Sequence, residues 1–193
     1  MKKLKMLLVP VTLLLIFFGT ACNNKGPEKS SDDKEVAEEH NDAKFDKAQE
    51  KDAQFLVDAA DINMTEIKLS ELAKGSAVTD DGKKLADMMI GEHKKALEEI
   101  QALASKKGIT IPNTLSENNQ KAYNKLNDKK GTEFDKEYCD MMVNGHKDAI
   151  DKFEKAANDA ADSDIRSLAS GMLPTLRTHL DHAMTCQEKC NKM

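Results

Sequence analysis

The chain has 193 residues, with 29 lysines and arginines against 34 aspartates and glutamates, and a formal net charge of −5. This acidic balance, together with the lack of a sustained basic run, argues against nucleic acid as a partner. Only 4% of the residues are aromatic, while alanine, lysine, acidic residues and methionine are abundant, which favours an all-α fold. No nucleophile–base motif, phosphate loop or pair of catalytic carboxylates points to an enzyme.

The N-terminus has the pattern of an export signal. Three lysines lie within the first five residues, an apolar run covers 6–18, and Gly19-Thr20-Ala21-Cys22 follows. The run is shorter than the about 20 apolar residues that a membrane-spanning helix needs. Small residues before a cysteine resemble a lipobox, although Gly19 stands where leucine is usual. We therefore expect a lipoprotein signal peptide over 1–21 and a lipid on Cys22, with ordinary cleavage and a free Cys22 thiol as the alternative.

This prediction places the mature protein at the cell envelope, facing the extracytoplasmic side, with the membrane as its partner through the lipid anchor. Residues 22–51 are predicted to be a polar tether, because a Gly, Pro and Ser-containing segment leads into a dense charge run. Residues 35–51 have helical character but too few apolar side chains to bury a face, and His40 is expected to be solvated. The folded domain is predicted over 52–193.

Four amphipathic helices are predicted in that domain, at about 52–75, 80–107, 132–157 and 163–191. Thr79, Thr132 and Asp162 are candidate N-caps. In the longer connection over 108–131, Thr114-Leu-Ser-Glu117 matches a capping box for a short extra helix. Short loops make the first two and the last two helices antiparallel, so the sequence predicts an up-down-up-down four-helix bundle. Pro174 is expected to kink the last helix.

Each predicted helix has an apolar stripe that a single ionisable residue interrupts. Steps of three and four residues keep the members of a stripe on one face. The interruptions are Glu66, His93, His146 and His179. The four stripes are Phe55, Ala59, Ile62, Glu66, Leu69, Ala73; Ala86, Met89, His93, Ala96, Ile100, Leu103; Cys139, Met142, His146, Ala149, Phe153, Ala156; and Met172, Leu176, His179, Ala183, Cys186, Cys190.

The four interrupting residues are expected to pair by height. Glu66 and His93 are equidistant from the first predicted turn, and His146 and His179 are equidistant from the second, so each pair is expected to meet inside the bundle. The sequence leaves open whether the two pairs share a level, because the long connection decides it. Two helices also share a Met-x-x-x-His element, with Met89 before His93 and Met142 before His146.

Three imidazoles and a carboxylate suit zinc, copper or iron, which makes Glu66, His93, His146 and His179 a candidate metal site. If Met89 or Met142 joins the ligands, the softer set favours Cu(I). A di-iron centre of the ferritin type is not expected, because no Glu-x-x-His element is present. One alternative is a metal-free hydrogen-bonded network. Another is an envelope interaction or stress protein in which the cluster is only structural.

Three further cysteines lie near the ends of the last two helices. Cys139 precedes His146 by seven residues and Cys186 follows His179 by seven, so level histidines imply level cysteines on facing stripes. The sequence therefore predicts a Cys139–Cys186 disulfide, with Cys190 as the competing partner. A soft-metal stripe of His182, Cys186 and Cys190 is the alternative.

Several segments in order resemble one family. They are Phe55-Leu-Val-Asp-Ala-Ala60, the helix that carries Glu66, Phe134-Asp-x-x-Tyr138 with Met142 and His146, and Leu173-Pro174 followed by His179-Leu180. Together they resemble the ferritin-like exported family catalogued as domain of unknown function 4142, over about 52–183. The resemblance implies a ferritin-like four-helix bundle in an exported protein, often labelled an outer-membrane protein, and carries no established activity.

Overall fold

The structure, a computed structural model, describes residues 32–193; the predicted signal peptide, Cys22 and the first part of the predicted tether lie outside the described residues. The described part is all-helical and has no strand, as the composition predicts. No helix of this part is both long and apolar enough to span a membrane. The helices are α1 (Asp33–Asp42), α2 (Lys47–Ser76), α3 (Asp80–Lys107), α4 (Glu117–Asn127), α5 (Gly131–Asp159) and α6 (Ser163–Asn191).

Two of the predicted N-caps are confirmed. The Thr79 hydroxyl accepts a hydrogen bond from the Gly82 amide at the start of α3, and the Asp162 carboxylate accepts from Asp164 and Ile165 at the start of α6. These bonds satisfy amides that have no partner within the first turn of a helix. At the other end of α3, Gly108 adopts a φ of 65°, which ends the helix in the left-handed region that glycine tolerates best.

Two other capping predictions are wrong. Thr132 lies inside α5, which begins at Gly131 after Lys130, a residue that makes no side-chain capping bond. The cap of α4 is Ser116 rather than Thr114. Thr114 is engaged elsewhere, because its backbone amide and its hydroxyl both donate to the Asp33 carboxylate. The segment from Thr114 to Glu117 matches a capping box in sequence. Because Thr114 instead bonds to Asp33, which is distant in the sequence, the helix begins after Ser116.

Four long helices form the bundle. The pairs α2–α3 and α5–α6 are the two hairpins, and α2–α5 and α3–α6 contacts join them into a ring. Ion pairs at both ends of the contact between α3 and α6 show the relative direction of the two helices. Asp81 near the start of α3 pairs with Lys189 near the end of α6, and Lys107 at the end of α3 pairs with Asp162 before α6. These two helices are therefore antiparallel.

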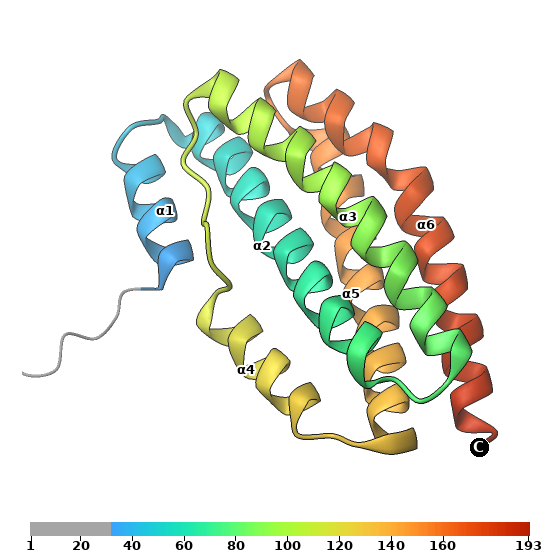
Figure 1. The fold of residues 1–193 in the computed structure, drawn as a ribbon. Helices are drawn as coiled ribbons and strands as arrows, with labels where there is room; N and C mark the ends of the chain where they lie inside the picture. Colours follow the sequence, from blue (N-terminus) through green and yellow to red (C-terminus); the bar gives the residue numbers. More distant parts are fainter. Residues whose placement is uncertain (1–31) are drawn as a thin grey trace, which may run out of the picture. The chain divides into compact units, whose positions relative to one another are not determined.

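The predicted up-down-up-down order is wrong. Since α6 is antiparallel to both α3 and α5, the latter two run in the same direction, and the order is down, up, up, down as seen in Figure 1. The cause is the connection over 108–130, which contains α4 and returns along the bundle to the end at which α3 begins (Figure 1). A single long crossover of this kind replaces one of the short loops of an up-down-up-down bundle.

Each hairpin holds the turn of the other through a buried aspartate. Asp135, near the start of α5, accepts hydrogen bonds from the Val78 and Thr79 amides in the α2–α3 turn, at 3.0 and 2.8 Å. Asp52, near the start of α2, accepts from the Ala161 and Asp162 amides in the α5–α6 turn, at 3.0 and 2.7 Å. These reciprocal contacts set the height of one hairpin against the other, which the sequence left open.

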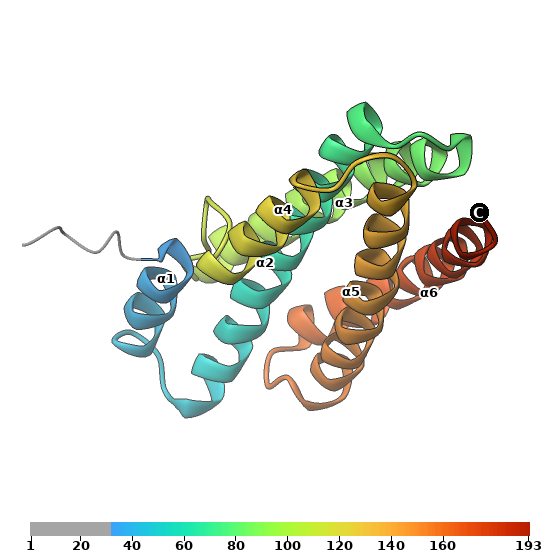
Figure 2. The ribbon, with the colours of Figure 1, turned by 90° about the horizontal axis from the view of Figure 1, so that it is seen from below.

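The predicted tether is wrong from residue 33 onward, because α1 and the first turn of α2 belong to the folded part. Helices α1 and α4 pack against α2 on the side away from α6 (Figures 1 and 2). Ala37 and Asn41 of α1 are buried, and the Asn41 side chain exchanges two hydrogen bonds with the Thr110 backbone. A 2.6 Å ion pair joins Lys34 to Asp58. These contacts are mostly polar, so an apolar pattern does not reveal them.

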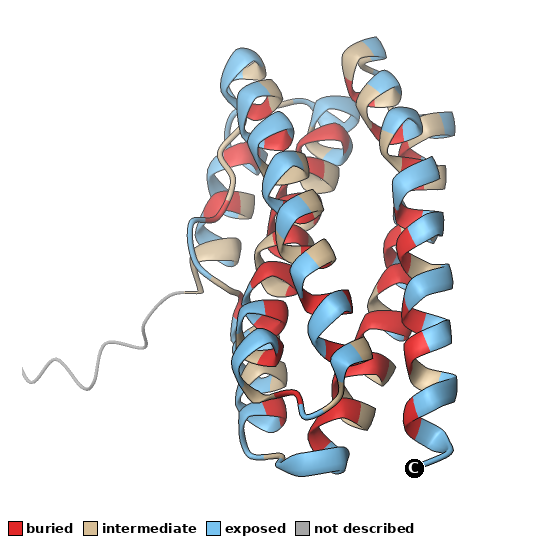
Figure 3. Cartoon of the chain, turned by 45° about the vertical axis from the view of Figure 1, so that its right-hand side comes forward, coloured by how far each residue is buried: buried red, intermediate tan, exposed pale blue. Residues whose placement is uncertain are grey.

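The core consists of two apolar clusters with a polar layer between them. One cluster, around Met89, Phe134 and Met142, lies toward the α2–α3 turn, and the other, around Ile100 and Phe153, lies toward the α5–α6 turn. Figure 3 shows the buried side of each long helix facing its neighbours. Between the clusters along each helix lie the four ionisable residues that interrupt the apolar stripes.

Candidate metal centre

All four residues that the sequence singled out are buried in the polar layer. Glu66 comes from α2, His93 from α3, His146 from α5 and His179 from α6, and none is more than 4% exposed. Side chains of all four helices meet at one level, a point that the sequence left open, and His146 meets His179 as the second predicted pair. The same helices supply the apolar residues above and below, so the imidazoles lie between two apolar clusters.

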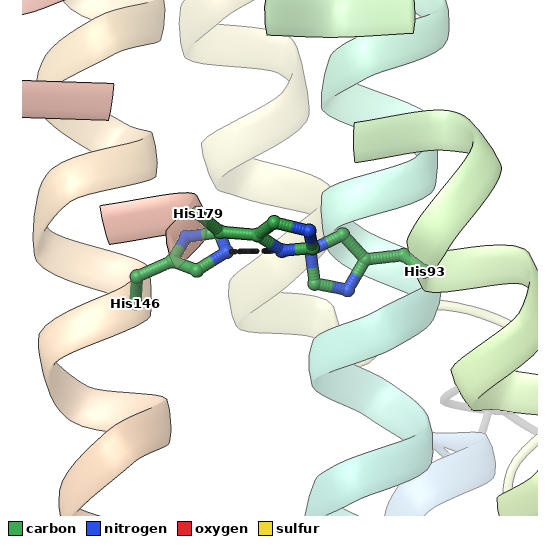
Figure 4. Close-up of side chains that lie close together, drawn as sticks. All are labelled: His93, His146 and His179. Carbon is green, nitrogen blue, oxygen red and sulfur yellow. Dashed lines mark hydrogen bonds between the residues drawn. The ribbon is translucent and has the colours of Figure 1, made fainter. Parts of the chain in front are cut away.

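The three imidazoles face one another (Figure 4). His93 Nε2 lies 3.3 Å from His146 Nε2, and His146 Nε2 lies 3.3 Å from His179 Nδ1. One ring nitrogen from each histidine lies within 4.8 Å of the other two, an arrangement that fits a common metal ion. The ring centroids are 5.1–5.4 Å apart, so the rings point toward a shared centre rather than stack.

Hydrogen bonds behind two of the rings determine which nitrogen carries the proton. His93 Nδ1 lies 2.9 Å from Asn63 Oδ1, and the Asn63 amide is oriented by its own donation to the Ala59 carbonyl. His146 Nδ1 lies 2.8 Å from the Met142 carbonyl oxygen. Since both partners accept, both Nδ1 atoms donate, and the Nε2 atoms of His93 and His146 turn their lone pairs toward each other.

Burial keeps these imidazoles neutral. The pKa of His93 is well below its ordinary value because of burial, reinforced by repulsion from His146 and His179. Burial also lowers the pKa of His146, against the opposing effect of its bond to the Met142 carbonyl. The pKa of His179 falls to about 4, mainly through burial. At neutral pH the cluster therefore offers unprotonated nitrogen atoms, which is the form that binds metal ions.

Glu66 occupies a different place from the one predicted. Its Oε1 lies 3.7 Å from Nδ1 of His146, which is the nitrogen directed away from the other imidazoles. Asn63, one helical turn earlier on α2, takes the position beside His93 that the hairpin midpoint assigned to Glu66. The ligand atoms that face one another, which we call the facing donor group, therefore belong to His93, His146 and His179 and do not include Glu66. Glu66 Oε2 is a buried side-chain oxygen with no hydrogen-bond partner within residues 32–193.

Asn63 is a residue of the candidate site that the sequence pattern did not reveal. It is 3% exposed and orients His93, and its only signal in the sequence is a polar residue three positions before Glu66 on an otherwise apolar face. Met89 and Met142 are fully buried in the adjoining apolar cluster. Met142 contacts the site through its backbone carbonyl, and a role for either sulfur as a ligand stays a prediction.

The cysteines form a second buried group toward the C-terminal end of α6. Cys139 and Cys186 are disulfide-bonded, with Cα atoms 6.0 Å apart, as the matching heights predicted. Cys190 is a buried free thiol whose sulfur lies 3.8 Å from that of Cys139, in agreement with its predicted role as the competing partner. His182 is exposed and does not join the cluster of three sulfur atoms, so the alternative to the disulfide, a metal stripe of His182, Cys186 and Cys190, is not formed.

Comparison with known proteins supports the fold and the family. A crystal structure of a DUF305 fragment from Deinococcus radiodurans is similar, with a TM-score of 0.63 and 11% sequence identity. The similar region covers 74% of this chain and 97% of that one, which at this identity is a likeness of fold. A search of curated proteins finds no match. The model of the family described as Domain of unknown function (DUF4142) matches residues 37–186, and the chain belongs to that family.

Proposed function

We propose that this protein binds one transition-metal ion at the centre of a ferritin-like bundle, through one ring nitrogen each of His93, His146 and His179. Three neutral imidazoles from three helices form the ligand set. Asn63 and the Met142 carbonyl hold two of the rings in the orientation that binding requires. Hydrogen bonds of this kind behind metal-binding histidines fix the tautomer and make the ligand nitrogen more basic.

The observation that carries the proposal is the spacing of the nitrogen atoms. Zinc binds imidazole nitrogen at about 2.0–2.1 Å in a tetrahedral site, so two ligands of one ion are separated by about 3.3 Å. The His93–His146 and His146–His179 nitrogen pairs are both separated by 3.3 Å. A hydrogen bond from His179 Nδ1 to His146 Nε2 accounts for the second distance but not for the first, because no proton lies between the Nε2 atoms of His93 and His146. A cation bound between them would remove the repulsion of their lone pairs.

The ligand chemistry favours zinc or copper. Imidazole suits zinc, copper and iron, and copper(II) stands highest among the divalent ions in the usual order of affinities. The di-iron centre of ferritins needs carboxylates on several helices, whereas Glu66 lies outside the facing donor group. We therefore propose a mononuclear zinc or copper site.

Metal titration of the purified protein tests the proposal. The full chain, stripped with a chelator and dialysed, is expected to bind one Zn²⁺ or Cu²⁺ ion in isothermal titration calorimetry. His146→Ala removes the nitrogen that contacts both neighbours and is expected to abolish binding. Asn63→Ala leaves all three ligands in place and is expected to weaken binding about 10–100-fold by releasing the His93 ring.

His182→Ala is the matched control, because this histidine is exposed on the same helix as His179 and is expected to leave binding unchanged. Equal stoichiometry in wild-type and His146→Ala protein would contradict the proposal. Absence of any bound ion would favour the metal-free polar network instead, and with it a structural cluster in an envelope interaction or stress protein.

We also propose that the bundle is carried at the extracytoplasmic face of a membrane by a lipid on Cys22. The support is the N-terminal pattern of lysines, apolar run and small residues before a cysteine. In bacterial cells grown with radiolabelled palmitate, the wild-type chain is expected to take up label and sediment with membranes. Cys22→Ser is expected to lose the label, and label that persists in this variant would contradict lipidation of Cys22.

A further inference from the structure

We propose that the metal has an open coordination position, reached through a groove between α3 and α6, and that a small exogenous molecule with a single nitrogen or oxygen donor binds there. This inference rests on the proposed metal site. It distinguishes a centre that exchanges ligands with solvent from a closed structural centre, in which the protein supplies every ligand.

The first support is the groove itself. It has a volume of about 260 Å³, and its lining includes His93 and His179 together with Asn63. Two of the three proposed ligands are therefore in contact with a space that opens to the surface. Glu92, Lys95 and Glu99 also line it, so the groove carries charges of both signs and is polar enough to hold water.

The second support is the number of protein ligands. Within residues 32–193, the facing donor group contains three histidines and no fourth histidine, cysteine or carboxylate. Glu66 is on the Nδ1 side of His146, away from the shared centre. Zinc sites with three protein ligands keep the fourth position for water or substrate. The groove supplies the path by which such a molecule arrives.

The packing of α3 on α6 explains why the groove exists. These helices are not joined by a loop, and they contact each other less extensively than the partners of either hairpin do. Small residues line the opening, among them Ala96 and Gly171. A Cβ atom built on Gly171 meets no atom within 4 Å, so this position faces open space. A larger side chain there would fill the groove without displacing the backbone.

Azide binding to the Cu²⁺-loaded full chain tests the inference. Azide is a small single-donor anion whose coordination to copper(II) produces a charge-transfer absorption band and changes the electron paramagnetic resonance spectrum. The wild-type protein is expected to show both changes with saturation. Gly171→Leu is expected to keep one bound copper ion and to weaken azide binding about tenfold or more, because the leucine occupies the path.

Gly91→Leu is the matched control. Gly91 lies on α3, is exposed, also has no atom within 4 Å of a built Cβ, and does not line the groove. The Gly91→Leu substitution introduces the same side chain into a long helix and is expected to leave azide binding unchanged. Circular dichroism and thermal unfolding of both variants separate a blocked groove from a misfolded protein.

Three results would overturn the inference. Bound copper that does not respond to azide would show a closed centre while leaving the metal site itself intact. Equal azide affinity in the Gly171→Leu and Gly91→Leu proteins would show that the groove is not the route. Failure of the wild-type chain to bind any metal would remove the proposed function and this inference together.

Discussion

The metal-free protein is expected to lose stability as the pH rises from about 6.5 to 8. Burial raises the pKa of Glu66 from its ordinary value of 4.5 to about 8. The folded protein therefore holds a proton on Glu66 that the unfolded chain releases above pH 4.5. Its contribution to stability is fully present below pH 4.5 and is lost as the pH rises through 8. One proton corresponds to about 1.4 kcal/mol per pH unit, and just above pH 6.5 the histidines of the unfolded chain, which are still releasing protons, offset part of this loss.

The histidines produce the opposite slope at lower pH. Burial lowers the pKa values of His93, His146 and His179 in the folded protein. Below about pH 6.5 the unfolded chain therefore binds protons on these histidines that the folded protein does not bind. The unfolded chain binds up to three protons on these histidines, whereas the folded protein binds one extra proton on Glu66, so in acid the histidines decide the sign of the slope. The free energy of unfolding is therefore expected to rise with pH from about 5 to 6.5, pass through a maximum, and then fall.

Urea unfolding at closely spaced pH values, in the presence of a chelator, measures this profile. Glu66→Gln keeps the size of the side chain and removes its titration, so the decline above pH 6.5 is expected to disappear while the acid slope stays. Glu71→Gln is the matched control, because this half-exposed glutamate on the same helix has a lowered pKa and titrates only in acid. A decline of equal slope in Glu66→Gln protein would show that Glu66 is not its source.

Reduction of the Cys139–Cys186 disulfide is expected to lower the free energy of unfolding by about 4 kcal/mol. The two cysteines are 47 residues apart in the sequence, and a cross-link of this span removes loop-closure entropy of that size from the unfolded chain. The bond joins α5 to α6 near the end of the hairpin opposite its turn. It therefore holds together the two helix ends that would separate most readily.

Substitution of the two bonded cysteines is expected to have unequal effects. Cys139→Ser leaves no cysteine on α5, so the full loss is expected. In Cys186→Ser, Cys190 is available 3.8 Å from Cys139 and can close a loop of 51 residues. Most of the stability is then expected to return after oxidation, because the two loops differ little in length.

Peptide mapping without reduction identifies the bonds, and urea unfolding with and without reductant measures their effect. A Cys139–Cys190 peptide in oxidised Cys186→Ser protein is the expected product. Equal losses in the two variants, or no such peptide, would show that Cys190 cannot replace Cys186.

Local sequence determined the helices and their inward faces. The bounds of α3 and α6 match the predicted ranges, because Thr79, Gly108 and Asp162 carry their own capping chemistry within a few residues. The three histidines were identifiable because each interrupts an apolar stripe with a period of three to four residues. The Cys139–Cys186 pairing followed from the same counting, since equal distance from a short turn places two residues at one height.

Tertiary structure decided how the two hairpins are joined and which groups complete the site. The crossover over 108–130 makes α3 and α5 parallel, and its direction depends on contacts of Asp33, Asn41 and Asp61 that are distant in the sequence. Two of these contacts, those of Asp33 and Asn41, are polar and attach α1 to this connection. Helix α2 packs between α3 and α5, so a side chain on its inward face can meet either neighbour. Glu66 is directed toward His146 of α5 and Asn63 toward His93 of α3, a choice that the apolar stripe of α2 alone does not specify.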